Sequence, residues 1–375
     1  MYYAKETVDK LLQSEHIIIY GAGVVAKEVA NCLLGAPYHL LVERFMVSEK
    51  ANNPSELMGI PVIDVAEGQK SYQNALILIA VMEKYLEDIQ ETLKKYHYSN
   101  IFVFSFESDL WSKIRGNYYW ELREKQGKQY LTLEEELNSV KNVSYLSDNT
   151  VHIYRACSHM DSILQTSLSE YDWELPIQVG ASLTEKRISD ICDDSGENIS
   201  TKNREYCELT ALYWIWKNDT SKYAGLCHYR RHFELDWEMI EKIAVSDIDV
   251  ILTIPILNFP NVRETYVFDH IEEDWVIMLQ AIKRLQPEYY QTAEQLQNGV
   301  FYYAYNMFIA RKEVLDDYCE WLFPILFYCE EKCNRKTDSY QNRYIGFLSE
   351  RLMSIYFLYN EDNLKIVHAQ KRFLQ

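Results

Sequence analysis

Residues 75–81 form an apolar run, Ala-Leu-Ile-Leu-Ile-Ala-Val, without one polar side chain. A strand with one face in water would alternate apolar and polar residues, and a membrane helix needs about 20 apolar residues. The run therefore predicts a strand buried on both faces, as in a parallel sheet covered by helices. The flanking sequence repeats the alternation, with strands expected at 16–20, 38–47, 59–62 and 101–104 and helices at 24–34 and 84–96.

A second α/β pattern follows later in the chain, after a stretch that shows neither pattern. We expect a small parallel-sheet domain over residues 1–108, a helical connector over 109–149 and a second α/β domain over 150–375. The connector mixes aromatic and charged residues and contains the acidic run 134–136, which is typical of a helix with one solvated face. The second pattern predicts strands at 151–154, 177–179, 223–227, 249–254 and 303–310 and helices at 204–217, 274–285, 314–329 and 345–358.

The chain carries 38 Lys and Arg against 56 Asp and Glu, a formal net charge of −18. This balance argues against a nucleic-acid binder, because affinity for phosphate backbones comes from clustered Lys and Arg. No apolar run is long enough for a transmembrane helix, and the beginning of the sequence lacks a secretory signal, so we expect a cytoplasmic protein. The eight cysteines are scattered singly without the spacing of zinc sites, which predicts free thiols.

The residues after the first expected strand read Gly21-x-Gly23-x-x-Ala26 and lead into a helix. In a dinucleotide fingerprint the first Gly permits the turn, the second admits a pyrophosphate, and the third small residue permits close packing. Glu43 is the candidate partner for a ribose hydroxyl, although it lies in an apolar run beside Arg44. Two interpretations stay open: a nucleotide or nucleotide-sugar site, and a tight turn in a Rossmann-like domain without a ligand.

A nearly all-apolar segment at 203–218 predicts a buried helix in the second domain. Asn203 suits its N-cap, and Glu208 places a carboxylate within the apolar part. A buried carboxylate needs a partner or a chemical role. Glu208 is therefore either paired with a core arginine or part of a functional site.

The strand expected at 223–227 is followed by His228-Tyr229-Arg230-Arg231. The window 220–233 holds three Lys or Arg, two His and no acidic residue. Ligands of α/β folds bind at the carboxyl ends of strands, and guanidinium groups suit phosphate oxygens. In a domain that is otherwise acidic, the window predicts a site for a small anion.

These motifs resemble a family of bacterial capsular and exopolysaccharide glycosyltransferases whose signature is a strand ending in HYRR. The resemblance covers about residues 150–370. The first domain resembles the small Rossmann-like module that precedes various polysaccharide-assembly enzymes. The motifs that carry the main resemblance are GAS at 180–182, DDSGENIS at 193–200, NREYCELTALYWIWKN at 203–218 and GLCHYRRHF at 225–233, with further pieces at 270–275, 305–309, 318–323 and 346–352.

The resemblance implies a GT-A-like fold that moves a hexose from a nucleotide diphosphate sugar, such as UDP-galactose, to a glycan acceptor in capsular or exopolysaccharide synthesis. It further implies a lipid-linked oligosaccharide as acceptor and a membrane-associated assembly complex, with the protein peripheral at the inner membrane face. The donor-binding residues are then Gly180, Ala181, Asp194, Asn198, Asn203, Glu208, His228, Tyr229, Arg230 and Arg231, and the acceptor-side residues are Asn306, Glu350 and Arg351.

GT-A enzymes usually neutralise the diphosphate with a divalent metal held by Asp-x-Asp at the carboxyl end of a strand. Here Asp247-Ile248-Asp249 precedes its expected strand, so we expect a structural role for this pair. HYRR stands where the metal motif would fit. Our hypothesis is that Arg230, together with His228, replaces the metal and that no cofactor is required, with Mn²⁺ or Mg²⁺ as the alternative.

An inverting transfer needs a group that takes the proton of the acceptor hydroxyl. The candidates are Asp269, His270 and Asp274. If the segment is helical, the i, i+4 spacing places His270 and Asp274 on one face. A helix N-terminal cap with a packed histidine is the alternative.

Two functions of other kinds stay open. If the glycine loop is the primary site, the chain is an NAD-dependent sugar-nucleotide oxidoreductase, for which the first domain is short. Alternatively, the chain is a non-catalytic scaffold that binds nucleotide sugars.

Overall fold

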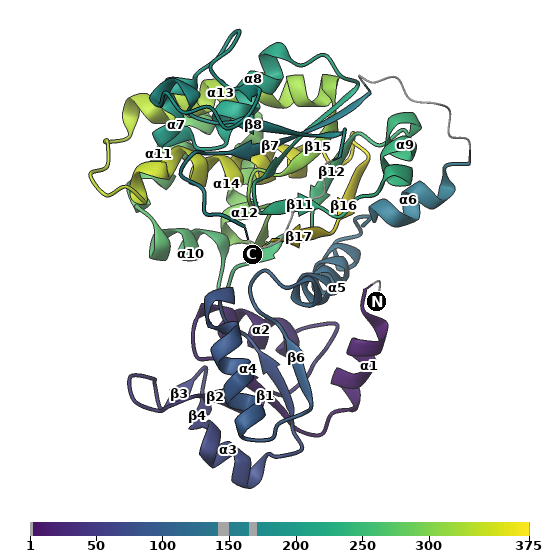
Figure 1. Cartoon of the computed structure of the whole chain (residues 1–375), viewed down its shortest axis with the longest axis vertical. Helices are drawn as coiled ribbons and strands as arrows, with labels where there is room; N and C mark the ends of the chain where they lie inside the picture. Colours follow the sequence, from purple (N-terminus) through teal and green to yellow (C-terminus); the bar gives the residue numbers. More distant parts are fainter. Residues whose placement is uncertain (1–2, 142–149, 165–170, 375) are drawn as a thin grey trace. The chain divides into compact units, whose positions relative to one another are not determined.

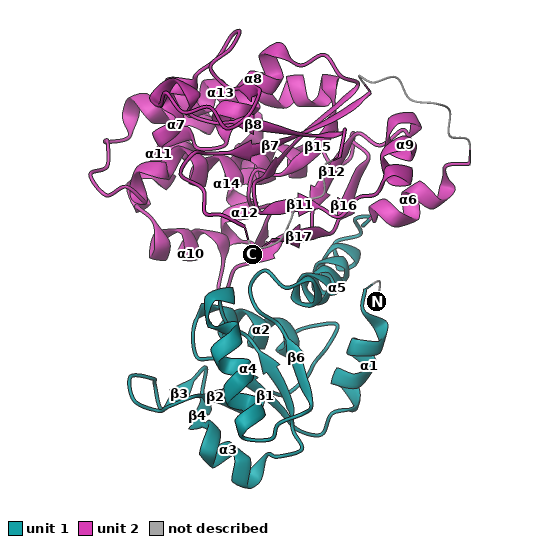
Figure 2. Cartoon of the chain, in the orientation of Figure 1, with its two compact units in different colours: residues 1–130 teal, residues 131–375 magenta. Residues whose placement is uncertain are grey.

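The computed structural model describes residues 3–141, 150–164 and 171–374. It is a mixed α/β structure that divides into two compact units, residues 1–130 and 131–375 (Figure 2). The boundary between the units falls inside the stretch expected as a connector. Helix α5 (Asp109–Lys125) belongs to the first unit and helix α6 (Leu133–Ser139) to the second. The end of that stretch, 142–149, lies outside the described residues.

The first unit is built on a six-stranded sheet in the order β3-β4-β2-β1-β5-β6 (Figure 1). Its neighbours pair in parallel except for the antiparallel pair β3–β4. The strands are β1 (Ile17–Tyr20), β2 (Arg44–Val47), β3 (Glu56–Leu57), β4 (Ile60–Asp64), β5 (Leu76–Ile79) and β6 (Ile101–Val103). The remaining helices of this unit are α1 (Lys5–Gln13), α2 (Val24–Leu34), α3 (Val65–Ser71) and α4 (Leu86–Lys95).

The two central strands of this sheet, β1 and β5, are buried at every position. This confirms the strand predicted from the apolar run. On one face, Ile18 and Ile77 belong to a core cluster that contains Ile89 and Leu93 of α4. Full burial of each such side chain contributes about 1.5–3 kcal/mol, which explains why this pattern dominates the local fold.

The second unit contains a mixed sheet in the order β16-β12-β15-β10-β7-β8-β9. Strands β10, β7, β8 and β9 run parallel, whereas β15 runs antiparallel between β10 and β12. Strand β11 pairs with the end of β10 and with β17. The strands are β7 (Val151–Cys157), β8 (Glu174–Gln178), β9 (Ile191–Cys192), β10 (Tyr223–His228), β11 (Arg231–Phe233), β12 (Val250–Thr253), β15 (Phe308–Arg311), β16 (Ile366–Ala369) and β17 (Lys371–Phe373), with β13 (Ile256–Leu257) and β14 (Phe301–Tyr302) as a separate pair.

Helices pack on both faces of this sheet (Figure 1). Residues of α6 and α9 (Trp237–Val245) share a core cluster with Tyr223 and Cys227 of β10. Side chains alternate along a strand, and the other face contacts α8 and α13 through β7, β10 and β15. The remaining helices are α7 (Asn203–Tyr206), α8 (Leu209–Asn218), α10 (Val262–Asp269), α11 (Glu272–Leu285), α12 (Tyr290–Asn298), α13 (Lys312–Lys332) and α14 (Tyr344–Tyr359). None of the helices in the described part of the chain combines the length and the apolar composition that crossing a membrane requires.

The helix expected over 204–217 is in fact two pieces, α7 and α8. The chain breaks at Cys207, which adopts a φ of 52°. Asn203 lies in the first turn of α7 and not at its N-cap, and its Nδ2 donates to the Cys207 carbonyl at 2.7 Å and to Thr210 Oγ1 at 3.1 Å. The break places Glu208 at the start of α8 instead of inside a continuous helix.

Candidate functional site

Three parallel strands of the second unit end at one edge of its sheet. His228 of β10 pairs with Ala156 of β7, and Cys157 of β7 pairs with Gln178 of β8. Strand β15 runs the other way and begins with Phe308 beside Leu226, which brings the turn before β15 to the same edge. Open α/β sheets bind ligands outside the carboxyl ends of their strands, so this edge is the natural place for a site.

The HYRR motif forms a tight hairpin at this edge, in which His228 pairs with Arg231. His228 Nε2 lies 2.6 Å from the carbonyl oxygen of Tyr305. Burial lowers the pKa of His228, so its imidazole is neutral at neutral pH and donates Nε2–H to that carbonyl. The Arg231 guanidinium lies 4.5 Å from the centroid of the Tyr305 ring. The motif therefore fixes the turn before β15.

The second residue of the hairpin turn, Arg230, lies against aromatic rings. Its guanidinium is 5.5 Å from the Tyr229 centroid and 5.3 Å from the Phe373 centroid. Its buried Nε finds no hydrogen-bond partner among the described residues, and an unsatisfied buried donor costs about 1–3 kcal/mol. A phosphate oxygen is an acceptor that a guanidinium binds well. Arg230 therefore carries a donor without a partner in the described structure, and an anion is the kind of acceptor that would suit it.

An acid that the sequence analysis missed, Asp161, lies close to Arg230. Burial raises the pKa of the Asp161 carboxyl, whereas Arg230 and His159 lower it. The carboxylate accepts the Ser158 N–H at 2.6 Å. Its sequence signal was its position just after β7, a strand that ends at the same edge of the sheet as β10.

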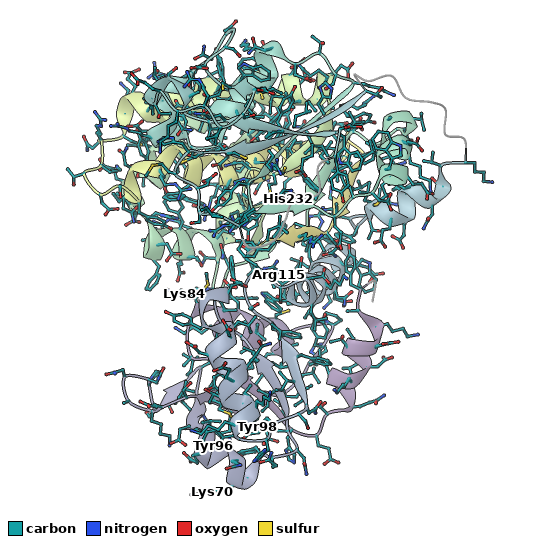
Figure 3. The ribbon with its side chains drawn as sticks, in the orientation of Figure 1. Lys70, Lys84, Tyr96, Tyr98, Arg115 and His232 are labelled. Atoms are coloured by element: carbon teal, nitrogen blue, oxygen red, sulfur yellow. The ribbon has the colours of Figure 1, made fainter. Side chains whose placement is uncertain are left out.

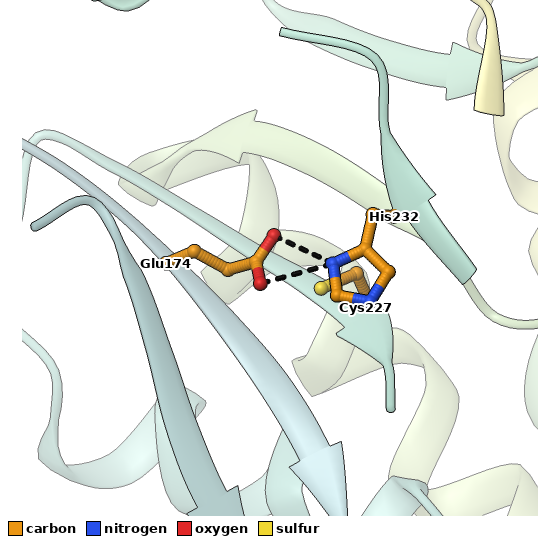
Figure 4. A group of neighbouring side chains, drawn as sticks. All are labelled: Glu174, Cys227 and His232. Atoms are coloured by element: carbon orange, nitrogen blue, oxygen red, sulfur yellow. Dashed lines mark hydrogen bonds and ion pairs between the residues drawn. The ribbon is translucent and has the colours of Figure 1, made fainter. Parts of the chain in front are cut away.

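His232, labelled in Figure 3, holds the hairpin through contacts of both ring nitrogens. Its Nδ1 lies 2.9 and 3.0 Å from the two carboxylate oxygens of Glu174, and its Nε2 lies 3.2 Å from the carbonyl oxygen of Tyr229 (Figure 4). Cys227 completes a group whose ligand-type atoms lie within 4.8 Å of one another. Arg155, however, pairs with the same carboxylate at 3.3 Å. We interpret the group as an ion-pair network that supports the Tyr229 turn.

Three residues at this edge adopt strained backbone conformations. Cys207, Tyr305 and Asn306 have φ values of 52°, 73° and 51°, and such conformations cost about 1–3 kcal/mol each and concentrate at functional sites. Two carboxylates hold Tyr305 and Asn306 in place. Glu350 Oε1 accepts the Tyr305 N–H at 2.8 Å, and Glu208 Oε1 accepts the Asn306 Nδ2–H at 2.7 Å. The strain and the carboxylates together mark this turn as the centre of the candidate site.

The three residues predicted on the acceptor side lie together at this centre. Asn306 contacts Glu208, and Glu350 Oε2 pairs with Arg351 at 2.8 Å. The side chains of Glu350 and Arg351 are 17% and 4% exposed. Burial raises the pKa of Glu350, and Arg351 opposes that rise. Glu208, for which the sequence left a core arginine as one possible partner, contacts the amide of Asn306 instead.

The loop after β8 is organised by Asp193, which the sequence analysis did not select. Its carboxylate accepts the N–H groups of Gly180 and Ala181 at 2.8 and 3.0 Å and the hydroxyls of Ser200 and Thr210 at 2.5 and 2.6 Å. Asp193 is fully buried. These four donors satisfy the carboxylate and fix the loop beside the carboxyl end of β8.

The predicted donor-binding residues in this loop make local contacts. Asp194 pairs with Arg187 at 2.9 Å, and Asn198 Nδ2 donates to the carbonyls of Asp194 and Gly196. Their expected contact with a donor stays a prediction. The neighbouring Asp193 was hidden because two adjacent aspartates look alike in sequence and only packing decides which one is buried.

The three candidate bases do not form one helix face. Helix α10 ends at Asp269, His270 is extended with φ −137°, and Asp274 lies in the first turn of α11. The segment breaks at His270, which corrects the i, i+4 placement. Asp274 is buried and pairs with Lys336 at 2.7 Å. His270 stacks on Phe347 at 4.0 Å.

The Asp247-Ile248-Asp249 motif lies at the start of β12, at the opposite edge from the candidate site. Asp249 pairs with Arg311, and Asp247 pairs with Lys365 at 2.8 Å. Both aspartates therefore neutralise nearby cations, as a structural pair would.

In the first unit, the glycine loop follows β1 and leads into α2. Gly21 has a φ of 131°, and a Cβ there would lie 2.5 Å from the Ala80 carbonyl oxygen, so packing explains this glycine. Gly23 is the N-cap of α2, and Ala26 is buried within that helix. Glu43 precedes β2 and pairs with His16 before β1. It therefore lies at the opposite end of these parallel strands from the loop, which corrects its placement as a ribose partner.

The second unit was compared with known protein families. A family described as a domain of unknown function, DUF4422, matches residues 153–361, more than half of the chain. The chain belongs to the DUF4422 family. The matched region includes the HYRR hairpin, Asp193 and both carboxylates that hold the strained turn. A comparison with curated proteins returns no match.

Among solved structures, the apo structure of the bifunctional glycosyltransferase WbbM is similar to this chain. The two are 28% identical, with a TM-score of 0.54 over 60% of this chain. The chain spans 46% of the length of that protein. The similarity agrees with the mixed α/β architecture of this chain.

Proposed function

We propose that the chain is a glycosyltransferase with a GT-A-like second unit, which moves a hexose from a nucleotide diphosphate sugar to a glycan. The observation that carries the proposal is Arg230, a cation with an unsatisfied buried Nε at the carboxyl edge of the sheet. Arg231 and the half-buried His228 lie beside it in the same hairpin. The similarity to a glycosyltransferase of known structure supports the reaction class.

In the proposed reaction the bond between the anomeric carbon and the diphosphate breaks, and the diphosphate leaves with the electron pair. Arg230 and Arg231 would stabilise the negative charge that develops on the leaving group. Neutral His228 holds the Tyr305 carbonyl and so keeps the hairpin in register with the turn before β15. This role for the arginines makes transfer independent of a divalent metal.

The finer assignments follow from the family resemblance. We propose a UDP-hexose such as UDP-galactose as donor and a lipid-linked oligosaccharide as acceptor, in capsular or exopolysaccharide synthesis at the inner membrane face. Gly180, Ala181 and Asn203 lie at the carboxyl edge of β8, which supports a donor site there. A Gly180 Cβ would lie 2.6 Å from Asn203 Oδ1, so the loop leaves no room for a side chain at this position.

A panel of UDP-sugars tests the proposal. We expect one of them to raise the melting temperature of the full chain and to be cleaved slowly to UDP with water as acceptor. Arg230→Ala should lower UDP release by about 100-fold or more, whereas Arg284→Ala at the end of α11 should leave it unchanged. EDTA should not affect the rate.

Three other outcomes would contradict parts of the proposal. Complete loss of UDP release with EDTA, restored by Mn²⁺, would replace the arginine hypothesis by metal catalysis. Reduction of a nicotinamide cofactor would support the oxidoreductase alternative. Binding of UDP-sugars without any cleavage, even with glycan acceptors present, would support the scaffold alternative.

A further inference from the structure

We propose that Glu208 is the catalytic base, the group that takes the proton of the acceptor hydroxyl. The assignment rests on the proposed glycosyl transfer and adds a residue to its mechanism. It takes the place of His270 and Asp274, whose side chains pack on Phe347 and pair with Lys336, and leaves Asp269 as the competing candidate.

The helix break positions the Glu208 carboxylate. Cys207 turns the chain with its strained φ, and Glu208 follows at the start of α8. One oxygen, Oε1, accepts the Asn306 amide at 2.7 Å. The other oxygen, Oε2, has no hydrogen-bond or ion-pair partner in the described part of the chain. The hydrogen bond at Oε1 therefore orients the carboxylate, and Oε2 is available to accept a proton.

Other charges of the site surround Glu208. It lies close enough to His228 to raise the pKa of that imidazole, while Arg231 and Arg343 lower it. It also raises the pKa of Glu350. Glu208 thus lies near the basic hairpin, where a diphosphate would leave, and a base must lie within reach of the reacting centre.

The second carboxylate at the centre, Glu350, has both oxygens engaged. Oε1 accepts the Tyr305 N–H and Oε2 pairs with Arg351. A proton arriving at Glu350 would compete either with the Tyr305 N–H at Oε1 or with Arg351 at Oε2. Two carboxylates in different environments can have different roles. Glu350 holds the backbone of Tyr305, and Glu208 accepts the proton.

The sequence candidates are less suited to this step. Burial, with Arg351, lowers the pKa of His270 to about 3, which makes the imidazole a poor proton acceptor near neutral pH. Asp274 is 1% exposed and neutralised by Lys336. Asp269 is exposed at the end of α10, and it is the alternative that the experiment must separate from Glu208.

The proposed step balances without a further reactant. The acceptor hydroxyl oxygen bonds to the anomeric carbon as its proton passes to Glu208 Oε2. The bond from the anomeric carbon to the diphosphate breaks, and its electron pair leaves with the nucleotide diphosphate. With water as acceptor, the same step gives free sugar and UDP.

The test compares UDP release from UDP-galactose, UDP-glucose and UDP-N-acetylglucosamine by the full chain and its Glu208→Gln variant. Glutamine keeps the carbonyl that accepts the Asn306 amide but cannot take the proton. We expect release to fall by about 100-fold or more, while the Kd for the same UDP-sugar, measured by calorimetry, changes less than threefold.

Azide distinguishes a catalytic base from a residue that only supports the fold, because azide cannot restore activity that is lost through a structural defect. It attacks the anomeric carbon without a proton to lose, so it should restore UDP release in Glu208→Gln and yield a glycosyl azide. Glu205→Gln is the matched control, because Glu205 also accepts an asparagine amide, from Asn342 at 3.1 Å, but lies outside the proposed machinery. Its rate should stay at the wild-type value.

The outcomes separate the two levels of the proposal. If the wild type releases UDP and Glu208→Gln releases it equally fast, the assignment of the base is overturned and glycosyl transfer stands. A loss confined to Asp269→Asn would move the base to that residue. If the wild type neither binds nor cleaves any of the UDP-sugars, the proposed function fails and the assignment fails with it.

Discussion

Lys336 Nζ lies 2.7 Å from Asp274 Oδ1, and the two side chains are only 7% and 1% exposed. Separated by 62 residues, they bring the chain after α13 against the first turn of α11. A buried ion pair of this kind adds little net stability, but removing one partner leaves an uncompensated buried charge. The pair gives Asp274, which the sequence suggested as a catalytic residue, a structural role.

Lys336→Met should therefore lower the free energy of unfolding by about 3–5 kcal/mol, measured by urea denaturation. The double variant Lys336→Met/Asp274→Leu should recover most of that loss, because neither charge remains buried. Lys332→Met, in an exposed pair with Glu331, should leave the midpoint nearly unchanged. An Asp274→Asn chain with wild-type stability and no sugar transfer would instead return this residue to the mechanism.

Asp193 and Asp194 should differ sharply in their contribution to stability. Asp193→Ala leaves four donors without their acceptor, and each unsatisfied buried donor costs about 1–3 kcal/mol, so we expect a loss of several kcal/mol or a chain that fails to fold. Asp194→Ala removes a half-exposed pair with Arg187 and should cost less than about 1 kcal/mol. Equal urea midpoints for the two variants would contradict this view of the loop.

Gly21 and Gly23, the two glycines of the loop after β1, offer a matched pair. Gly21→Ala places a Cβ 2.5 Å from the Ala80 carbonyl oxygen at a φ of 131°, and a side chain there forces strain of about 1–3 kcal/mol or more. At Gly23 a Cβ meets nothing within 4 Å, so Gly23→Ala should leave the melting temperature almost unchanged. If both variants melt alike, packing is not the reason for Gly21.

His270 should make the protein sensitive to acid. Burial holds its pKa at about 3, against 6.5 when unperturbed, so the unfolded state binds a proton that the folded state excludes. Between these values the free energy of unfolding falls as the pH falls, by up to about 1.4 kcal/mol per pH unit. His270→Phe, which retains a ring against Phe347, should flatten that dependence in urea titrations between about pH 7 and pH 4. Parallel curves for the two proteins would show that His270 does not titrate in this way.

Hydrophobic pattern predicted much of the architecture because burial of apolar side chains dominates local structure. It located the strands that became β5, β7 and β10, and it placed HYRR at the end of a strand. It also showed Asp247 and Asp249 on the wrong side of their strand for a metal motif. In each case the information lies in neighbouring residues and in the direction of one strand.

Other features depend on contacts between distant residues. The apolar pattern of 203–218 is continuous across Cys207, so it could not reveal the break that orients Glu208. The expected strand at 303–310 begins only at Phe308, because the strained turn before it is held by Glu350 from another helix. The spacing of residues in the sequence does not show that both oxygens of Glu350 accept contacts and that only one oxygen of Glu208 does.

The sequence by itself determined two α/β patterns and a basic strand end within an acidic chain, since periodicity and charge are local properties. Only the tertiary structure decided which acidic side chains have partners. Asp274 is neutralised by Lys336, Glu350 holds a backbone N–H, and Glu208 keeps one oxygen without a partner in the described structure. The reactivity of a carboxylate depends on its burial and its partners, and packing brings those partners together from segments far apart in the chain.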